Sequence, residues 1–151
     1  MLETLFSPKS IAVIGASRTE GKLGYAVLAN IIESGFGGDI YPINPKADQI
    51  LGLSCYSGLE GIQDEIHLAV IVIPAKYVIG TLEACAERGV GSVIVISAGF
   101  RETGHEGLMA ERKRAEMAQK YQLRIVGPNC LGVFDSLAAV SDTHLGARER
   151  L

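Results

Sequence analysis

The stretch SIAVIGASRTEGKLGYAVLANIIESG, residues 10–35, reads as a strand, a glycine-containing loop and a helix in immediate succession. Ser10 to Gly15 is a short β-branched run that stops at a glycine, which is typical of a buried strand. Apolar residues then recur at helical spacing at Val27, Leu28 and Ile31. A strand followed at once by a helix is the first half of a βαβ unit.

The same alternation continues along the chain. Residues 46–66 are the exception, because they show no clear period and only a short strand near 53–56 is expected there. The other expected elements are strands at 39–43, 67–73, 92–96 and 123–126, a helix that begins at Pro74 and a charged helix over 105–121. We therefore predict an α/β, Rossmann-like, doubly wound fold with a mostly parallel sheet and helices on both of its faces.

Composition fits one compact domain. The chain has 151 residues, of which 48% are hydrophobic and 21% charged, and this length is within the range of a single domain. We expect residues 1–134 to form that domain and residues 135–151, which lack a convincing period, to be a linker-like tail.

Charge and cysteine usage exclude several classes of partner. A net charge of −3 without a basic, aromatic-rich run disfavours nucleic acid. Cys55, Cys85 and Cys130 are widely spaced and form no metal-ligand pattern, so neither a disulfide framework nor a metal site is expected. The sequence shows no membrane-length apolar run and no secretion signal, and a cytoplasmic location is therefore predicted.

The loops that follow the predicted strands are where a ligand is expected, because open parallel sheets bind ligands beyond the carboxyl ends of their strands. These loops are built from small, proline-constrained or polar residues that let backbone N–H groups approach a ligand. The residues singled out there are Gly15, Ala16, Ser17, Arg18, Asn44, Pro45, Lys46, Pro74, Ala75, Ser97, Ala98, Gly99, Asn129 and Cys130.

The first of these loops leads into a helix N-terminus, which favours a phosphate group. Ser17, Arg18 and Lys22 would add donors to such a site. Gly15 and Gly24 fit two interpretations: close approach of the backbone to a phosphate, or a tight turn with close helix–sheet packing. On the first interpretation, Gly15→Val should block binding and leave the fold largely intact.

The loop does not match the nicotinamide fingerprint G-x-G-x-x-G, since Ser17 and Glu20 occupy the second and third glycine positions. The second predicted strand ends in Asn44-Pro45-Lys46, where a ribose diol would favour an acidic residue. Lys46 suits an additional phosphate, which both NADP and the 3′-phosphate of coenzyme A carry. Lys46 alone leaves these two ligands, and a solvated surface lysine, equally open.

Six blocks, in the order SIAVIGAS, GKLGYAVLANI, IYPINPK, LAVIVIPA, VIVISAGF and IVGPNCLG, cover most of the chain up to residue 134. Together they resemble the CoA-binding domain of the NDP-forming acyl-CoA synthetases and, more distantly, the first domain of the succinyl-CoA synthetase alpha subunit. The resemblance implies that coenzyme A is bound as a substrate. Its phosphates would lie over Gly15 to Ser17, its phosphorylated ribose near Lys46, its pantetheine past Pro74-Ala75 and Ser97-Ala98-Gly99, and its thiol near Asn129-Cys130.

The same resemblance implies a reaction that passes through an acyl phosphate and a phosphorylated histidine. In that family the histidine belongs to a following domain and the nucleotide is bound by an ATP-grasp module, and this chain contains neither. His67, His105 and His144 fall outside the family motif, so we expect no catalytic residue in this chain and expect those modules as its partners.

Other functions are compatible with the sequence: a free-standing CoA-binding or regulatory protein, an NAD(P)-binding domain, or a relative of lysine acetyltransferases that share this first domain. The acyl substrate and the choice between ADP and GDP lie outside what these residues determine.

Overall fold

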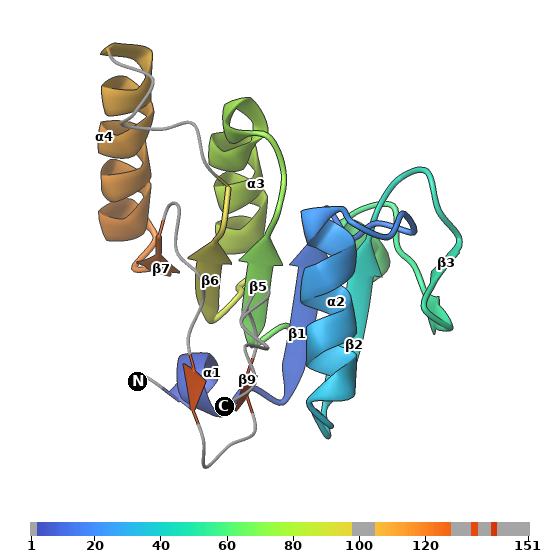
Figure 1. The fold of residues 1–151 in the computed structure, drawn as a ribbon. Helices are drawn as coiled ribbons and strands as arrows, with labels where there is room; N and C mark the ends of the chain where they lie inside the picture. Colours follow the sequence, from blue (N-terminus) through green and yellow to red (C-terminus); the bar gives the residue numbers. More distant parts are fainter. Residues whose placement is uncertain (1–2, 98–104, 128–133, 136–139, 142–151) are drawn as a thin grey trace, which may run out of the picture.

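A computed structural model describes residues 3–97, 105–127, 134–135 and 140–141. The described residues form a five-stranded parallel sheet in the order β2-β1-β5-β6-β7 (Figure 1). Its strands are β1 (Ser10–Ile14), β2 (Asp39–Ile43), β5 (Leu68–Ile71), β6 (Ser92–Val95) and β7 (Arg124–Val126). The predicted α/β class and the mostly parallel sheet are confirmed.

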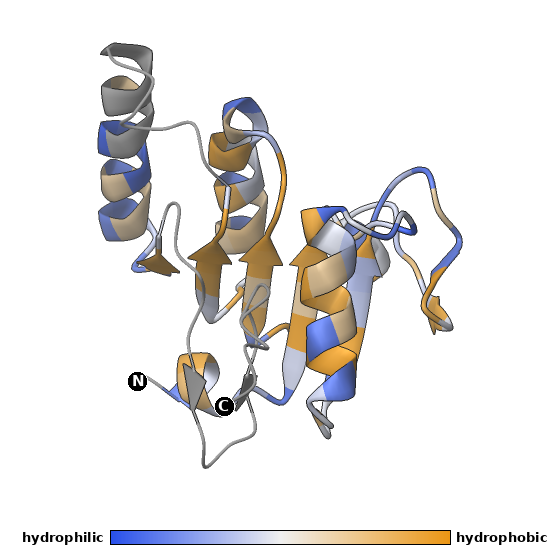
Figure 2. Ribbon diagram, viewed as in Figure 1, coloured by the Kyte–Doolittle hydropathy of each residue, from blue (hydrophilic) through white to orange (hydrophobic). Residues whose placement is uncertain are grey.

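Helices cover both faces of this sheet because successive strand side chains point to opposite sides. Ile11 and Val13 join a core cluster with α2 (Leu23–Glu33), whereas Ala12 and Ile14 join a second cluster with α3 (Ala75–Glu87). The second cluster also receives Met117 of α4 (His105–Lys120). Figure 2 shows the strands as predominantly hydrophobic, as strands covered on both faces should be.

The short helix α1 (Glu3–Phe6) was not expected from the sequence. It buries Leu5 in the same cluster as α2, and Thr4 Oγ1 lies 2.7 Å from the hydroxyl of Ser92 in β6. A four-residue segment shows no period that sequence analysis can detect, so only tertiary contacts fix it.

Residues 46–66 are more regular than the sequence indicated. β3 (Gln49–Ile50) and β4 (Leu53–Ser54) form an antiparallel hairpin whose turn residues Leu51 and Gly52 both have positive φ, 50° and 80°. Tyr56 then bridges Ile43 in parallel, with its N–H donating to the Pro42 carbonyl at 2.9 Å. The strand predicted near 53–56 is therefore confirmed in part, and this bridge extends the sheet beyond β2.

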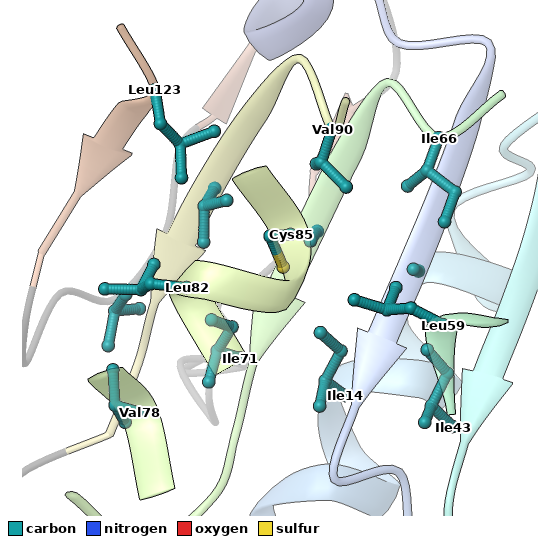
Figure 3. Close-up of a cluster of buried hydrophobic side chains, with 14 of the residues drawn as sticks. Ile14, Ile43, Leu59, Ile66, Ile71, Val78, Leu82, Cys85, Val90 and Leu123 are labelled. Atoms are coloured by element: carbon teal, nitrogen blue, oxygen red, sulfur yellow. The ribbon is translucent and has the colours of Figure 1, made fainter. Parts of the chain in front are cut away.

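After this bridge the chain forms the 3-10 helix η1 (Leu59–Gly61), on the same sheet face as α3. Leu59 packs beside Ile14 and Ile43, as Figure 3 shows. η1 and α3 thus lie on the same face of the sheet, and Leu59 of η1 lies at the carboxyl ends of β1 and β2.

The described part of the tail contains β8 (Phe134–Asp135) and β9 (Val140–Ser141), which pair antiparallel. The boundary predicted after residue 134 falls inside β8, and the division into domain and tail stays a prediction. Among the described residues, no helix has the length and apolarity needed to cross a bilayer.

Candidate ligand-binding site

The carboxyl ends of β1 and β5 meet where the direction of strand order reverses. From β1 the chain moves to β2 on one side and later returns to β5 on the other. Backbone hydrogen bonds join the end of β1 to both neighbours: Gly15 N–H donates to the Ile43 carbonyl of β2 at 3.1 Å, and Val72 N–H, just after β5, donates to the Ile14 carbonyl at 2.8 Å. Such a reversal is where doubly wound folds bind their ligands.

A pocket of about 610 Å³ opens at this place, within the size range of small-molecule sites, about 300–1,000 Å³. It has contributions from the loop after β1, the loop after β2, the segment before η1, the end of β5 and one face of α3. Its lining residues are Ile14, Gly15, Ala16, Ser17, Lys22, Ile43, Asn44, Pro45, Ser57, Gly58, Leu59, Glu60, Val72, Ile73, Pro74, Tyr77, Gly80, Thr81 and Ala84. The structure thus brings together Gly15, Ala16, Ser17, Lys22, Asn44, Pro45 and Pro74 of the predicted site residues.

Gly15 and Gly24 are both required by packing. Gly15 has φ +92°, and a Cβ built on it would overlap the Val72 carbonyl oxygen and lie 2.8 Å from Ile73 Cγ2. A Cβ on Gly24 would overlap the Gly15 carbonyl oxygen. These contacts support the packing interpretation of both glycines. Valine at position 15 would overlap the backbone at the end of β5, so Gly15→Val would strain the fold, and a loss of binding in that variant would not separate the two interpretations.

Asn44 connects the first two loops. Its Nδ2 donates to the Ala16 carbonyl at 2.8 Å, and its Oδ1 accepts from the N–H of Lys46 at 2.9 Å. In the first loop, Ser17 Oγ accepts from the N–H of Thr19 at 3.1 Å. Asn44 therefore fixes the relative position of the loops instead of reaching freely into the pocket.

Three cationic side chains belong to this end of the sheet. Lys22 is the N-cap residue of α2, makes no side-chain cap bond and lines the pocket. Arg18 and Lys46 are exposed and lie outside the lining, but the Arg18 guanidinium donates to the Lys46 carbonyl at 3.2 Å. The first turn of α2 adds backbone N–H groups that lack intrahelical acceptors. An anion placed at this loop would meet positive charge from two directions.

Other predicted residues are not in the lining. Ser97 is buried, and its Oγ accepts from the N–H of Ile73 at 3.1 Å, which ties the end of β6 to the end of β5. Ala75 is the first residue of α3, and Gly24 packs beneath the first loop. The remaining predicted residues, Ala98, Gly99, Asn129 and Cys130, lie outside the described part of the chain.

Sequence analysis missed two walls of the pocket. One is residues 57–60, which have no period and reach the site only because Tyr56 pairs with β2. The other is the α3 face formed by Tyr77, Gly80, Thr81 and Ala84. The signal for this face was present, since these four residues follow helical spacing beside the buried stripe and three of them are small.

The titratable groups in the described structure do not form a catalytic constellation at the pocket. Burial raises the pKa of the Cys85 thiol to about 12 and also raises the pKa of Cys55, which keeps both thiols protonated. Tyr41 lies in the core, where burial and a hydrogen bond to Asp64 raise its pKa to about 12. No group of three or more His, Cys, Asp or Glu side chains suited to a metal ion occurs among the described residues.

Comparisons with known proteins identify the family of this chain. Residues 9–135 match the family described as CoA binding domain. The chain is 48% identical to the ADP-forming acetate–CoA ligase of Methanocaldococcus jannaschii over 135 residues, which are 89% of this chain and 19% of that protein. It is 44% identical to the alpha subunit of ADP-forming acetate–CoA ligase II of Pyrococcus furiosus over 145 residues, 96% of this chain and 32% of that subunit.

A solved structure shows the same fold. The dinucleotide forming acetyl-coenzyme A synthetase 1 of Ca. Korarchaeum cryptofilum, in complex with phosphate and ADP, matches with a TM-score of 0.89 and 38% identity. The match covers 95% of this chain and 30% of that one. The present chain therefore spans only about a fifth to a third of the curated relatives it matches.

Proposed function

Because this chain belongs to the CoA-binding domain family, we propose that its pocket binds coenzyme A as a substrate for an ADP-forming acyl-CoA synthetase. The observation that carries the proposal is the pocket where the strand order reverses, lined by Gly15, Ala16, Ser17 and Lys22. Backbone N–H groups, a helix N-terminus and a lysine at one loop are what a diphosphate requires.

The 3′-phosphate of coenzyme A is assigned to the two cations beside this loop. Arg18 and Lys46 come from different loops, and the hydrogen bond from Arg18 to the Lys46 carbonyl holds the guanidinium against the backbone of the Lys46 loop. Asn44 keeps the Lys46 loop against the Ala16 loop. On this assignment the ribose of coenzyme A lies on the β2 side of the diphosphate.

The pantetheine arm is proposed to run the other way, past Pro74 and toward the ends of β5 and β6. Pro74 lines the pocket, and the Ser97 hydroxyl holds the N–H of Ile73 at the end of β5. Such a path leads the thiol away from the ribose. The predicted positions of Ala98, Gly99, Asn129 and Cys130 along this path remain part of the proposal.

Within a complete synthetase this chain would bind coenzyme A, and other domains or subunits would supply the phosphohistidine and the nucleotide site. The short share of the relatives that the chain covers supports this division of labour. A cytoplasmic location is proposed with it, because Cys55 and Cys85 are free thiols.

Calorimetric titration of the chain with coenzyme A, NAD and NADP tests the ligand. We expect saturable binding of coenzyme A and weaker or no binding of both nicotinamide nucleotides. A preference for NAD or NADP would replace the proposal with the nicotinamide alternative.

Gel filtration with candidate partner subunits, followed by an assay of ligase activity, tests the assignment to a synthetase. A stoichiometric complex that gains activity is the expected result. Coenzyme A binding without complex formation or activity would instead favour a free-standing binding or regulatory protein.

A further inference from the structure

We propose that the outer edge of the sheet, between β2 and the β3–β4 hairpin, is a docking surface for an extended, apolar and basic segment of polypeptide from the rest of the synthetase. The identity of this partner rests on the proposed function, whereas the surface itself does not. Figure 1 shows the hairpin outside β2, which is an edge strand of the sheet. Among the described residues, a cleft of about 260 Å³ lies here, between residues 38–41 on one side and Leu53, Ser54 and Tyr56 on the other. It shares none of these lining residues with the ligand pocket.

Pro42 accounts for the opening of the cleft. The strand that leaves the hairpin pairs with β2 at Tyr56, whose N–H donates to the Pro42 carbonyl and whose carbonyl accepts from the N–H of Asn44, both at 2.9 Å. One step closer to the hairpin, this parallel ladder would need the N–H of residue 42 to donate to Ser54. Proline has no N–H, so the pairing stops there and leaves the two strands unpaired.

Both walls of the cleft carry backbone groups that point into it. In β2 the N–H of Asp39 bonds toward β1, so the next residue, Ile40, directs its N–H and C=O outward. In the hairpin, the bond from the Cys55 N–H to the Asp48 carbonyl makes Ser54 a position whose backbone groups face away from β3. Within the described part of the chain, these outward groups of Ile40 and Ser54 have no hydrogen-bond partner.

Unpaired N–H and C=O groups on both walls suit a polypeptide backbone, which offers the same two groups along its length. An extended segment at the open end of the cleft would pair with Ile40 on one side and with Ser54 on the other. Because Pro42 lacks a donor and the neighbours of Ile40 bond toward β1, Ile40 is the one residue of β2 that offers both groups outward. The position of a bound segment along β2 is therefore fixed.

Leu51, in the turn of the hairpin, supplies an apolar contact beside the cleft. Its side chain is 42% exposed and its φ is 50°, a region that asparagine or glycine usually occupies in a two-residue hairpin turn. Leucine thus adds exposed apolar surface where a polar residue would fit the backbone better. Burial beneath a docked segment would offset both costs. Leu53, two residues further on, lines the cleft itself.

The charge beside the cleft is negative. Asp39 lines it, and Asp64 accepts a hydrogen bond from the Tyr41 hydroxyl at 3.0 Å. Burial, this hydrogen bond and the charges of Asp39 and Asp64 together raise the pKa of Tyr41 to about 12. Among the described residues that line the cleft there is no Lys, Arg or His. A segment that carries a basic side chain beside its apolar one would therefore be attracted to this edge.

The partner is assigned to the rest of a synthetase because this chain spans only about a fifth to a third of its ligase relatives. One of these relatives is itself an alpha subunit. A complete synthetase on this plan contains far more polypeptide than the present chain. A docking edge that leaves the ligand pocket open suits its attachment.

The test uses overlapping synthetic peptides that tile the unmatched parts of the two ligase relatives. They are screened against the purified chain, and the affinity of each bound peptide is measured by calorimetry. Ser54→Pro removes one outward N–H at an exposed position where the hairpin does not use that N–H. Ser54→Ala is the matched control, because it keeps the N–H and loses only the side chain. Ile40→Pro and Ile40→Val make the same comparison on the other wall, and Leu51→Asn removes the apolar contact.

We expect a peptide with apolar and basic residues to bind the wild-type chain. Ser54→Pro and Ile40→Pro should weaken it about tenfold or more, whereas Ser54→Ala and Ile40→Val should leave its affinity within about twofold. Leu51→Asn should weaken the same peptide about fivefold and also raise the urea midpoint of the free chain, because asparagine suits the positive φ. Coenzyme A affinity should stay within about twofold in every variant that folds.

Absence of peptide binding to the wild-type chain, or proline variants that bind as tightly as their controls, would overturn the inference. Self-association of the chain that Ser54→Pro abolishes would also overturn it, because a second copy would then be the occupant. If Ile40→Pro does not fold, the two Ser54 variants decide the question. Failure of the wild-type chain to bind coenzyme A would overturn the proposed function instead, and the peptide titrations would still decide whether this edge is a docking surface.

Discussion

Replacing Gly15 by alanine tests how tightly the loop after β1 is built. The new Cβ would overlap the Val72 carbonyl oxygen, and the residue would keep φ +92°, a region that L side chains rarely adopt. The backbone conformation costs a non-glycine residue about 1–2 kcal/mol, and forcing an extra carbon into a packed site costs about 1–3 kcal/mol. We therefore expect Gly15→Ala to lower the free energy of unfolding by about 2–5 kcal/mol, a large fraction of the stability of a typical domain.

Gly35→Ala is the matched control for this substitution. Gly35 has φ +78° and nothing within 4 Å of an added Cβ, so its replacement carries the backbone cost without the overlap, about 1–2 kcal/mol. Urea unfolding followed by far-UV circular dichroism measures both variants, with the slope of the transition checked for constancy. If Gly15→Ala is no more destabilising than Gly35→Ala, the overlap does not exist in solution and the packing argument for this loop fails.

Three further outcomes are expected. Lys46→Ala should weaken the binding of coenzyme A about tenfold and change the affinity for dephospho-coenzyme A by less than about threefold. If calorimetric titration shows equal losses for both ligands, Lys46 does not bind the 3′-phosphate. Asn44→Ala deletes the side-chain bond to the Ala16 carbonyl, which joins the two loops, and the bond from the Lys46 N–H within the second loop. It should lower the free energy of unfolding by about 1–3 kcal/mol and also weaken coenzyme A binding; unchanged affinity would show that the loops hold their positions without Asn44. Burial raises the pKa of Cys85 from 9.0 to about 12, so the folded chain keeps a proton that the unfolded chain loses above pH 9. Stability should therefore fall between pH 9 and 12, by at most about 1.4 kcal/mol per pH unit from this group, and Cys85→Ala should reduce that slope in urea titrations at several pH values.

The central strands β1, β5 and β6 were predictable because every one of their residues is buried. Asp39–Ile43 was identified with the observed bounds, and the strand predicted over Ser10 to Gly15 ends one residue earlier, at Ile14. Gly15 and Asn44-Pro45 mark the ends of these two runs and leave few alternatives. Helix α2 was identified from its apolar spacing, with Val27, Leu28 and Ile31 all buried. Local pattern and tertiary environment agree in these segments.

The segment between β2 and β5 could not be predicted in the same way. The hairpin turn places Leu51, a residue with no turn preference, at φ 50° beside Gly52, and tertiary context overrides propensity there. The bridge between Tyr56 and Ile43 joins two residues that are separated by a stretch of sequence with no repeating pattern. Neither feature has a local signal of useful length.

The sequence predicted the strand-end loops of the candidate site but not its other walls. The strand-end loops could be located because parallel topology gathers them at one edge. Asn44 was singled out as a ligand contact, but its side chain proved to join two backbones, which depends on loop packing. The α3 wall depends on how that helix is rotated on the sheet, and residues 57–60 depend on a sheet extension, so both required the structure.

Amide chemical-shift mapping by NMR during a titration with coenzyme A would locate the ligand on the chain residue by residue. We expect the largest shifts on Gly15, Ala16, Ser17 and the first turn of α2 at Leu23, with further shifts at residues 57–60 and Tyr77. Saturation with coenzyme A that moves only amides away from the carboxyl ends of β1 and β5, or that moves none, would contradict the proposed site.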